Sequence, residues 1–258
     1  WMFCLASAAF PQAQISSGDI KGTVKDSSDA VVPDASVTVT NTETGVERRT
    51  TTDMLGTYRF LVLPPGAYEL KAARAGFATY VRRPIDVTVG ASVIIDPRLQ
   101  PAGIQQEVLI QEETPLLETA RIQQSDTITE ERIQNLPINE RNFLNFSLLT
   151  PGVTDARGLV TFTLPQTPTS GLSFLGQGGR SNNVTIDGVD NNDNAVGAVR
   201  STMGQDAVEE FQINRSNYSA EFGRASGGLI NIVSKSGTNK WNGTAFGFWR
   251  DQALDARN

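Results

Sequence analysis

Between residues 19 and 100 the chain alternates apolar and polar residues in short runs, which Gly, Pro, Asp and Asn separate. A period of two residues places every second side chain on the same face, which is typical of a half-buried β-strand. Val and Thr fill these runs, as in most strands. The pattern predicts a small antiparallel β-sandwich with strands at residues 20–25, 35–41, 47–52, 57–61, 66–73, 85–89 and 92–99.

Beyond residue 126 the pattern mixes helical spacing with strands. Glu130 and Glu131 place acidic residues in the first turn of a short predicted helix, which ends before Pro137. The other predicted elements are a helix at 140–149, in which Phe143, Phe146 and Leu149 recur at helical spacing, and strands at 184–186, 208–214 and 229–233. This region is therefore predicted to be an α+β domain.

The last predicted strand, at residues 243–250, has an unusual distribution of side chains. Thr244, Phe246 and Phe248 share one face, whereas Gly243, Ala245 and Gly247 share the other. Large aromatics outside and small residues inside suit the wall of a membrane β-barrel, with Trp241 and Trp249 at interfacial depth. The alternative is the edge strand of a soluble sandwich.

Composition removes most enzyme classes. The chain has no histidine and one cysteine, Cys4, which excludes Ser-His-Asp and Cys-His catalysis, imidazole metal sites and an internal disulfide. No phosphate-binding P-loop motif occurs, and a net charge of −6 without a dense basic block argues against nucleic-acid binding. We therefore predict that the protein is not an enzyme and has no catalytic residues, metal site or cofactor.

The first ten residues are an apolar stretch followed by polar sequence. Ten residues cannot span a bilayer, which needs about 20, but they fit the apolar core of a signal peptide, with Ala6 and Ala8 flanking a cleavage candidate. We interpret residues 1–14 as a signal-peptide remnant and expect export. The alternative is a short buried strand or helix at a free terminus.

Residues 101–126 form an acidic segment that we interpret as a linker. Its middle carries a short apolar alternation formed by Glu107, Val108, Leu109, Ile110 and Gln111. Such a segment can lend its unpaired backbone edge to the sheet of another protein. The alternative is a plain linker whose Val108 and Ile110 dock on a neighbouring domain.

Two polar loops permit a ligand-binding interpretation. Residues 177–181 are glycine-rich but lack the strand-then-helix context of a phosphate loop. Residues 187–194 are rich in Asp and Asn, but an EF-hand would need glycine at Ala195 and glutamate at Ser201. Turn chemistry is therefore favoured over a phosphate or calcium site in both loops.

The first domain resembles the carboxypeptidase regulatory-like family. The shared residues, in order, are 22–24 (GTV), 32–39 (VPDASVTV), 56–60 (GTYRF), 63–68 (LPPGAY) and 75–77 (AGF). Gly56 supplies a turn before a strand in which Tyr58 and Phe60 point to one face, and Tyr68 joins them in the expected core. The resemblance implies a transthyretin-like or Ig-like accessory sandwich without catalytic residues. A sugar or peptide site is the functional alternative.

The second domain resembles the plug of TonB-dependent outer-membrane receptors, in the Oar-like subgroup that carries an N-terminal sandwich. The shared segments are 136–141 (LPINER), 148–153 (LLTPGV), 179–190 (GRSNNVTIDGVD), 208–213 (VEEFQI) and 218–239 (YSAEFGRASGGLINIVSKSGTN). The resemblance implies a mainly β chain in a fixed order. The sandwich at 19–100 precedes a linker at 101–126, a plug at 127–239, and the first strand of a truncated outer-membrane β-barrel at 240–258.

The same resemblance implies partners and sites. Residues 107–111 fall where the TonB box should be, so they would bind a TonB-type energy transducer. The plug would occlude the protein's own C-terminal barrel in the outer membrane, with the sandwich on the periplasmic side. The loop residues Gly178, Gly179, Arg180, Ser181, Asn182, Asn183, Asp190, Asn191, Asn192 and Asp193 are candidates for contact with a small-molecule, saccharide or peptide substrate.

A second hypothesis belongs to a different class. A secreted adhesin or carbohydrate-binding protein could consist of the same two β-rich modules and would make no use of the acidic linker. Alternating strands of about ten residues with aromatic girdles, following residue 258, would eliminate it.

Overall fold

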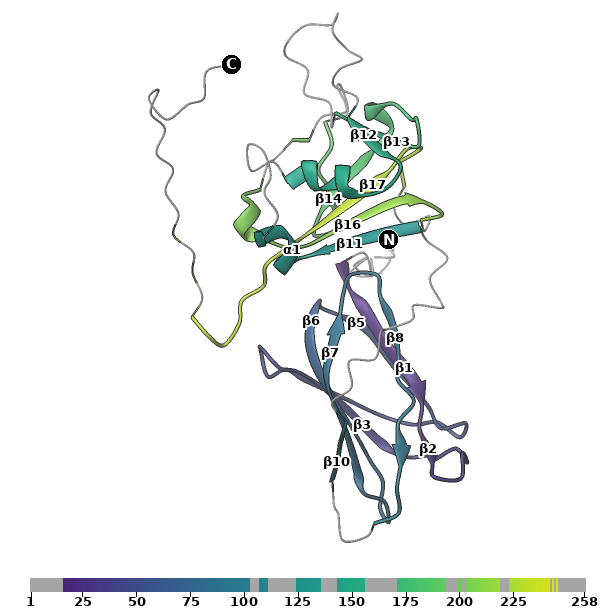
Figure 1. Ribbon diagram of the computed structural model, residues 1–258. Helices are drawn as coiled ribbons and strands as arrows, with labels where there is room; N and C mark the ends of the chain where they lie inside the picture. The colour runs from purple at the N-terminus through teal and green to yellow at the C-terminus, as the bar shows by residue number, and fades with distance from the viewer. Residues whose placement is uncertain are drawn as a thin grey trace, which may run out of the picture.

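The computed structural model describes residues 16–102, 107–110, 124–135, 143–155, 171–193, 199–200, 203–218, 223–241, 243 and 245. Within these ranges the chain forms two β-rich units, which lie end to end in Figure 1. The expected signal-peptide remnant at 1–14, the candidate residue Gln111 and most of the expected strand at 243–250 lie outside the described residues. No helix among the described residues is long and apolar enough to cross a membrane.

The first unit has two larger sheets around one core, drawn in purple and blue in Figure 1. One sheet has the strand order β10-β7-β6-β3-β4 and the other β5-β1-β8, while β2 and β9 form a small third sheet. The core between them includes Ile20, Leu63, Leu70 and Leu99, each almost fully buried. The strands are β1 (Gly18–Thr23), β2 (Lys25–Asp26), β3 (Ser36–Asn41), β4 (Glu47–Thr51), β5 (Thr57–Leu63), β6 (Gly66–Ala73), β7 (Thr79–Val87), β8 (Ser92–Ile94), β9 (Arg98–Leu99) and β10 (Glu107–Ile110).

Most strands predicted for this unit are confirmed. The strand at 66–73 agrees residue for residue, and those at 35–41, 47–52 and 57–61 agree to within two residues at each end. Tyr58, Phe60 and Tyr68 are buried in the core as expected, and Gly56 adopts a positive φ of 71° in the predicted turn.

Three predicted strands differ from the structure. The strand expected at 20–25 divides at Val24 into β1 and β2. The strand expected at 85–89 begins at Thr79 instead, because Arg82, Arg83 and Pro84 interrupt the apolar alternation without interrupting the strand. The strand expected at 92–99 divides into β8 and β9, and Pro97 lies in the gap between them. Proline has no N–H with which to continue a ladder.

The prediction of an antiparallel sandwich was correct for only part of this unit. The pairs β1–β8, β2–β9 and β7–β10 are parallel. An alternation of period two defines the two faces of a strand, but it carries no information on the direction of the neighbouring strand. Parallel partners need a long crossover, and β8 indeed returns to β1 only after six intervening strands.

The second unit is a five-stranded sheet with short helices, drawn from teal to yellow in Figure 1. Its strand order is β11-β16-β17-β14-β15, and β12 pairs separately with β13. Phe146, Phe174, Phe211 and Ile232 belong to a core on one face of the sheet, where the rings of Phe146 and Phe211 meet edge to face at 6.5 Å. The elements are β11 (Gln124–Thr129), α1 (Glu130–Asn135), η3 (Phe143–Leu149), β12 (Val153–Asp155), β13 (Leu172–Phe174), η5 (Gly179–Ser181), β14 (Asn183–Ile186), β15 (Val189–Asp190), η6 (Gln205–Ala207), β16 (Val208–Ser216) and β17 (Leu229–Ser234).

The helices and strands predicted here are confirmed, with one correction. Where a helix was expected at 140–149, the described part is a 3₁₀-helix, η3. Residues three apart lie above one another in a 3₁₀-helix, and Phe143, Phe146 and Leu149 follow one another at intervals of three. Strand β11 was not predicted, and it begins at Gln124, within the segment interpreted as a linker.

Turn chemistry shapes the end of the sheet that carries the candidate loop residues. Asp187 and Gly188 have φ values of 49° and 80° and form the two-residue turn between β14 and β15, as the sequence predicted. Positive φ at both central positions is the signature of a type I′ hairpin turn. At Gly228 any side chain would collide with the ring of Phe174, so β17 can approach β13 only with glycine there.

Candidate functional site

The residues predicted to bind a partner form the terminal strand of a sheet. Glu107–Ile110 is β10, which pairs in parallel with β7, with Glu107 opposite Thr79 and Ile110 opposite Arg82. Because β10 ends the strand order, no described residue pairs with its second edge. A strand with one free edge is compatible both with addition of a partner strand and with a linker that docks on the sandwich.

The loop residues predicted to contact a substrate form one connected group. The Asn192 amide donates to Oδ1 of Asn183 at 2.5 Å, and Oδ1 of Asn192 accepts from the backbone N–H of Val184 at 3.0 Å. Asn182 donates to the carbonyl oxygen of Leu172 at 2.8 Å, and its Oδ1 accepts from the N–H of Gly228 at 3.0 Å. The structure therefore brings the 178–183 and 190–193 segments together.

Most of these asparagines serve the scaffold. Asn182, Asn183 and Asn191 are buried, and the side chain of Asn183 donates to the carbonyl oxygen of Gly223 at 2.9 Å. Buried amides of this kind replace the backbone partners that irregular loops lack. Of the predicted set, Gly178 and Arg180 are exposed on η5 or beside it and are available for contact with a ligand.

Asp190 is held in an ion pair. Its carboxylate lies 2.8 Å from the Arg224 guanidinium and accepts hydrogen bonds from Asn192. Burial alone would raise the pKa of Asp190, but the hydrogen bonds from Asn192 and the positive charge of Arg224 outweigh it and lower that pKa. The charge of Asp190 thus stabilises the loop. Among the described residues, no group of three or more Cys, Asp or Glu side chains is placed to hold a metal ion.

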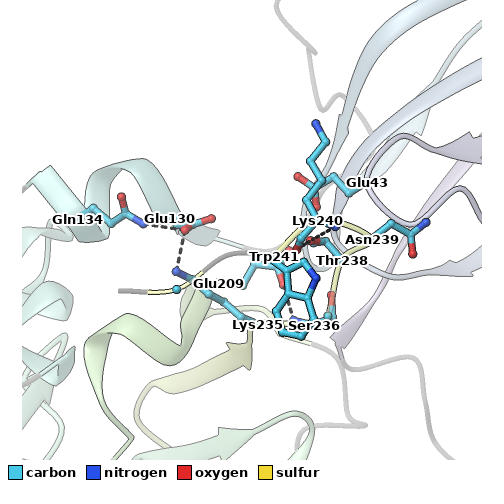
Figure 2. Close-up of a pocket in the computed structure, with 12 residues that line it drawn as sticks. Glu43, Glu130, Gln134, Glu209, Lys235, Ser236, Thr238, Asn239, Lys240 and Trp241 are labelled. Atoms are coloured by element: carbon cyan, nitrogen blue, oxygen red, sulfur yellow. Dashed lines mark hydrogen bonds and ion pairs between the residues drawn. The ribbon is translucent and has the colours of Figure 1, made fainter. Parts of the chain in front are cut away.

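A polar cleft of about 780 Å³ lies where the first unit, helix α1 and the segment after β17 come together (Figure 2). Lys235 pairs with Glu130 at 2.7 Å, and Gln134 donates to the same carboxylate. Burial raises the pKa of Glu209, and the neighbouring charges of Glu43 and Glu130 raise it further. The lining residues come from segments far apart in the sequence, so no local motif could have predicted this cleft.

The two units also meet at a buried junction, which the sequence analysis missed. In the turn between β7 and β8, the N–H of Val89 donates to Oε2 of Glu210 at 2.8 Å, and Nε2 of Gln212 donates to the carbonyl oxygen of Val89 at 3.1 Å. Val89 is 0% exposed and Gln212 is 1% exposed. The only sequence signal was that Glu210, Gln212 and Asn214 alternate with Phe211 and Ile213, which marks a polar face but not its burial.

Residues 19–100 match the family described as carboxypeptidase regulatory-like domain. They form a carboxypeptidase regulatory-like domain. The resemblance of this segment to that family is thereby confirmed, and the sandwich of β1–β10 contains the domain.

The similarity extends beyond the carboxypeptidase regulatory-like domain. The TonB-dependent transporter Oar of Myxococcus xanthus is 29% identical in an alignment that covers 96% of this chain and 23% of the transporter. The chain therefore spans about a quarter of the length of this curated relative, and it corresponds to the N-terminal part of an Oar-like transporter. The resemblance to TonB-dependent receptors is confirmed at this level.

Solved structures overlap with smaller parts of the chain. The outer-membrane transporter YddB of Escherichia coli is 21% identical, covering 43% of this chain and 17% of its own, with a TM-score of 0.36. A putative carbohydrate-binding protein from Bacteroides uniformis is 18% identical, covering 33% of this chain and 41% of its own, with a TM-score of 0.28.

Proposed function

We propose that this chain is the N-terminal part of a TonB-dependent outer-membrane receptor, in which residues 127–239 form a plug that gates energy-coupled uptake. The similarity to Oar along 96% of the chain supports this assignment, since it includes both units. A transporter of this kind has no catalytic residues of its own. The substrate would be a small molecule, a saccharide or a peptide, and the exposed residues Gly178 and Arg180 are the first candidates to contact it.

The observation that carries the proposal is the position of Glu107–Ile110 at the end of its sheet. A strand already held in extended conformation loses little entropy when a second strand pairs with its free edge. Such strand addition obtains its affinity from main-chain hydrogen bonds. In the proposed receptor, β10 is the TonB box, and the added strand belongs to a TonB-type energy transducer in the periplasm.

The surroundings of the two units follow from this role. The carboxypeptidase regulatory-like domain would lie on the periplasmic side of the outer membrane. The plug would fill the barrel formed by the rest of the protein, whose first strand would lie within residues 240–258. The short polar hairpin of β14 and β15 and the η5 loop would then be the part of the plug that meets substrate.

The test is a titration of the 258-residue chain with the C-terminal domain of a TonB-type transducer, using a pair of proline variants. The N–H and C=O of one strand residue point to the same side, and successive residues alternate. Of Val108→Pro and Leu109→Pro, therefore, one removes an N–H from the free edge and the other removes an N–H from the pairing with β7.

We expect the variant altered at the free edge to bind the transducer domain at least about tenfold more weakly, because it loses a hydrogen bond and gains a steric clash. The other variant serves as the control for proline in the same strand. Equal binding by both variants and the wild-type chain would refute β10 as the box. No binding by a folded wild-type chain would favour the secreted adhesin instead.

A further inference from the structure

Val89 connects the two units through its own backbone, and we call the three residues Val89, Glu210 and Gln212 the Val89 clamp. The N–H of Val89 has a carboxylate acceptor and its carbonyl has an amide donor, at 2.8 and 3.1 Å. Both polar groups of one peptide segment are thus satisfied by side chains of the other unit. A buried pair of this kind is costly to separate, because each group then loses its partner.

On the sandwich side, the loop that carries Val89 is held in place. The N–H of Gly90 donates to the carbonyl oxygen of Ser17 at 3.0 Å, and the N–H of Asp19 donates to that of Ala91 at 2.9 Å. Gly90 has a φ of 67°, the left-handed conformation that the turn requires. The loop is therefore a rigid extension of the sheet formed by β1, β5 and β8 and of the end of β7.

In the second unit, Glu210 and Gln212 project from β16, a strand that is paired along both of its edges. β16 pairs with β11 along one edge and with β17 along the other. Phe211 and Ile213 point into the core, so Glu210 and Gln212 point to the opposite face. Among the described residues Oε1 of Gln212 has no hydrogen-bond partner, which leaves its contact with Val89 as the bond that orients this buried amide.

The same loop is close in sequence to the partner-binding strand proposed above. β7 ends at Val87, two residues before Val89, and β7 is the strand with which β10 pairs. Backbone pairing therefore connects β10 to β7, the chain itself connects β7 to Val89, and the side chains of Glu210 and Gln212 connect Val89 to β16. A flexible tether between two independent units would not place β10 at any defined distance from β16.

We propose that the Val89 clamp docks the carboxypeptidase regulatory-like domain on the second unit, so that β10 is held at a fixed position relative to β16. The docking itself concerns only this chain, whereas its importance for energy coupling rests on the proposed function. In that function the domain is a rigid connection between the transducer-binding strand and the plug, rather than a mobile accessory.

Hydrogen exchange at the Val89 amide tests the contact directly. In the wild-type chain this amide should be protected, and in Glu210→Ala it should exchange at least about tenfold faster, because the buried N–H then lacks its acceptor. Glu209→Ala removes a carboxyl group from the preceding residue of β16, which accepts from the N–H of Ser236, and should leave the exchange unchanged. Equal exchange rates in wild-type and Glu210→Ala would overturn the proposal.

A distance measurement tests the docking from the loop side, without altering β16. Spin labels at Met54→Cys and Val189→Cys, in a Cys4→Ser background, occupy exposed positions in the two units. The wild-type clamp should give one narrow distance distribution. Val89→Pro removes the donor and should broaden it, whereas Val89→Ala retains the donor and should not.

A broad distribution with the wild-type clamp would overturn the proposal, as would the same narrow distribution in Val89→Pro. Both measurements are made without a transducer. Loss of the docking would therefore leave the TonB box assignment standing, and failure of the transducer titration would leave the docking standing.

Discussion

Replacement of Asn182 by alanine distinguishes a scaffold residue from a ligand-binding residue. The Asn182 side chain donates to the carbonyl oxygen of Leu172 and accepts from the N–H of Gly228, and all three residues are buried. Asn182→Ala leaves one buried acceptor and one buried donor without partners. At about 1–3 kcal/mol for each of the two groups, we expect the free energy of unfolding of the second unit to fall by about 2–6 kcal/mol.

The loss is best measured by urea unfolding followed through hydrogen exchange of peptides from β14 and β17, with peptides from β3 and β6 as an internal reference for the sandwich. Arg180→Ala, two residues away and exposed, is the matched control and should change stability by less than about 0.5 kcal/mol. If the free energy of unfolding of Asn182→Ala also changed by less than about 0.5 kcal/mol, the scaffold would not need this amide, and its assignment as a structural residue would be refuted.

Two further substitutions test one hydrogen bond in the first unit and one carboxyl group in the second. Tyr58→Phe removes the hydroxyl that donates to the carbonyl oxygen of Ile95 at 2.7 Å in the sandwich core, and should destabilise the first unit by about 1–3 kcal/mol without affecting β14 or β17 in the same exchange assay. For Glu209, burial and the charges of Glu43 and Glu130 raise the pKa above 4.5, so the folded chain binds the proton more tightly than the unfolded chain. Stability should therefore decrease as the pH rises from 4.5 through the folded pKa, and thermal melting of Glu209→Gln should lose this dependence; an unchanged pH profile in Glu209→Gln would contradict the assignment.

Local chemistry explains which parts of the fold the sequence predicted well. The Asp187-Gly188 turn needs positive φ at two successive residues, and this pair of residue types is among those that adopt it most readily. The alternation around Tyr58 and Phe60 identified a core face because burial follows apolar side chains. The 3₁₀ form of η3 was missed because spacings of three suit both kinds of helix over a short segment.

The candidate loop residues show the same limit. The sequence favoured turn chemistry for residues 187–194, but it did not indicate that Asn182 and Asn183 bind to Leu172 and Gly223 rather than to a ligand. The hydrogen-bond partners of a side-chain amide are the polar atoms that the fold places next to it. Each of these residues looked equally available for a substrate until its surroundings were known.

By itself, the sequence determined the strand pattern, the turns, the carboxypeptidase regulatory-like domain and the exclusion of imidazole chemistry. The tertiary structure decided the parallel pairing of β10 with β7, the burial of Gln212 and the seating of Val89 against Glu210, which is 121 residues away. The physical reason is that alternation is a property of one strand, which fixes its two faces. The neighbour of each edge, and whether a polar face meets water or another domain, depends on distant segments that no local pattern records.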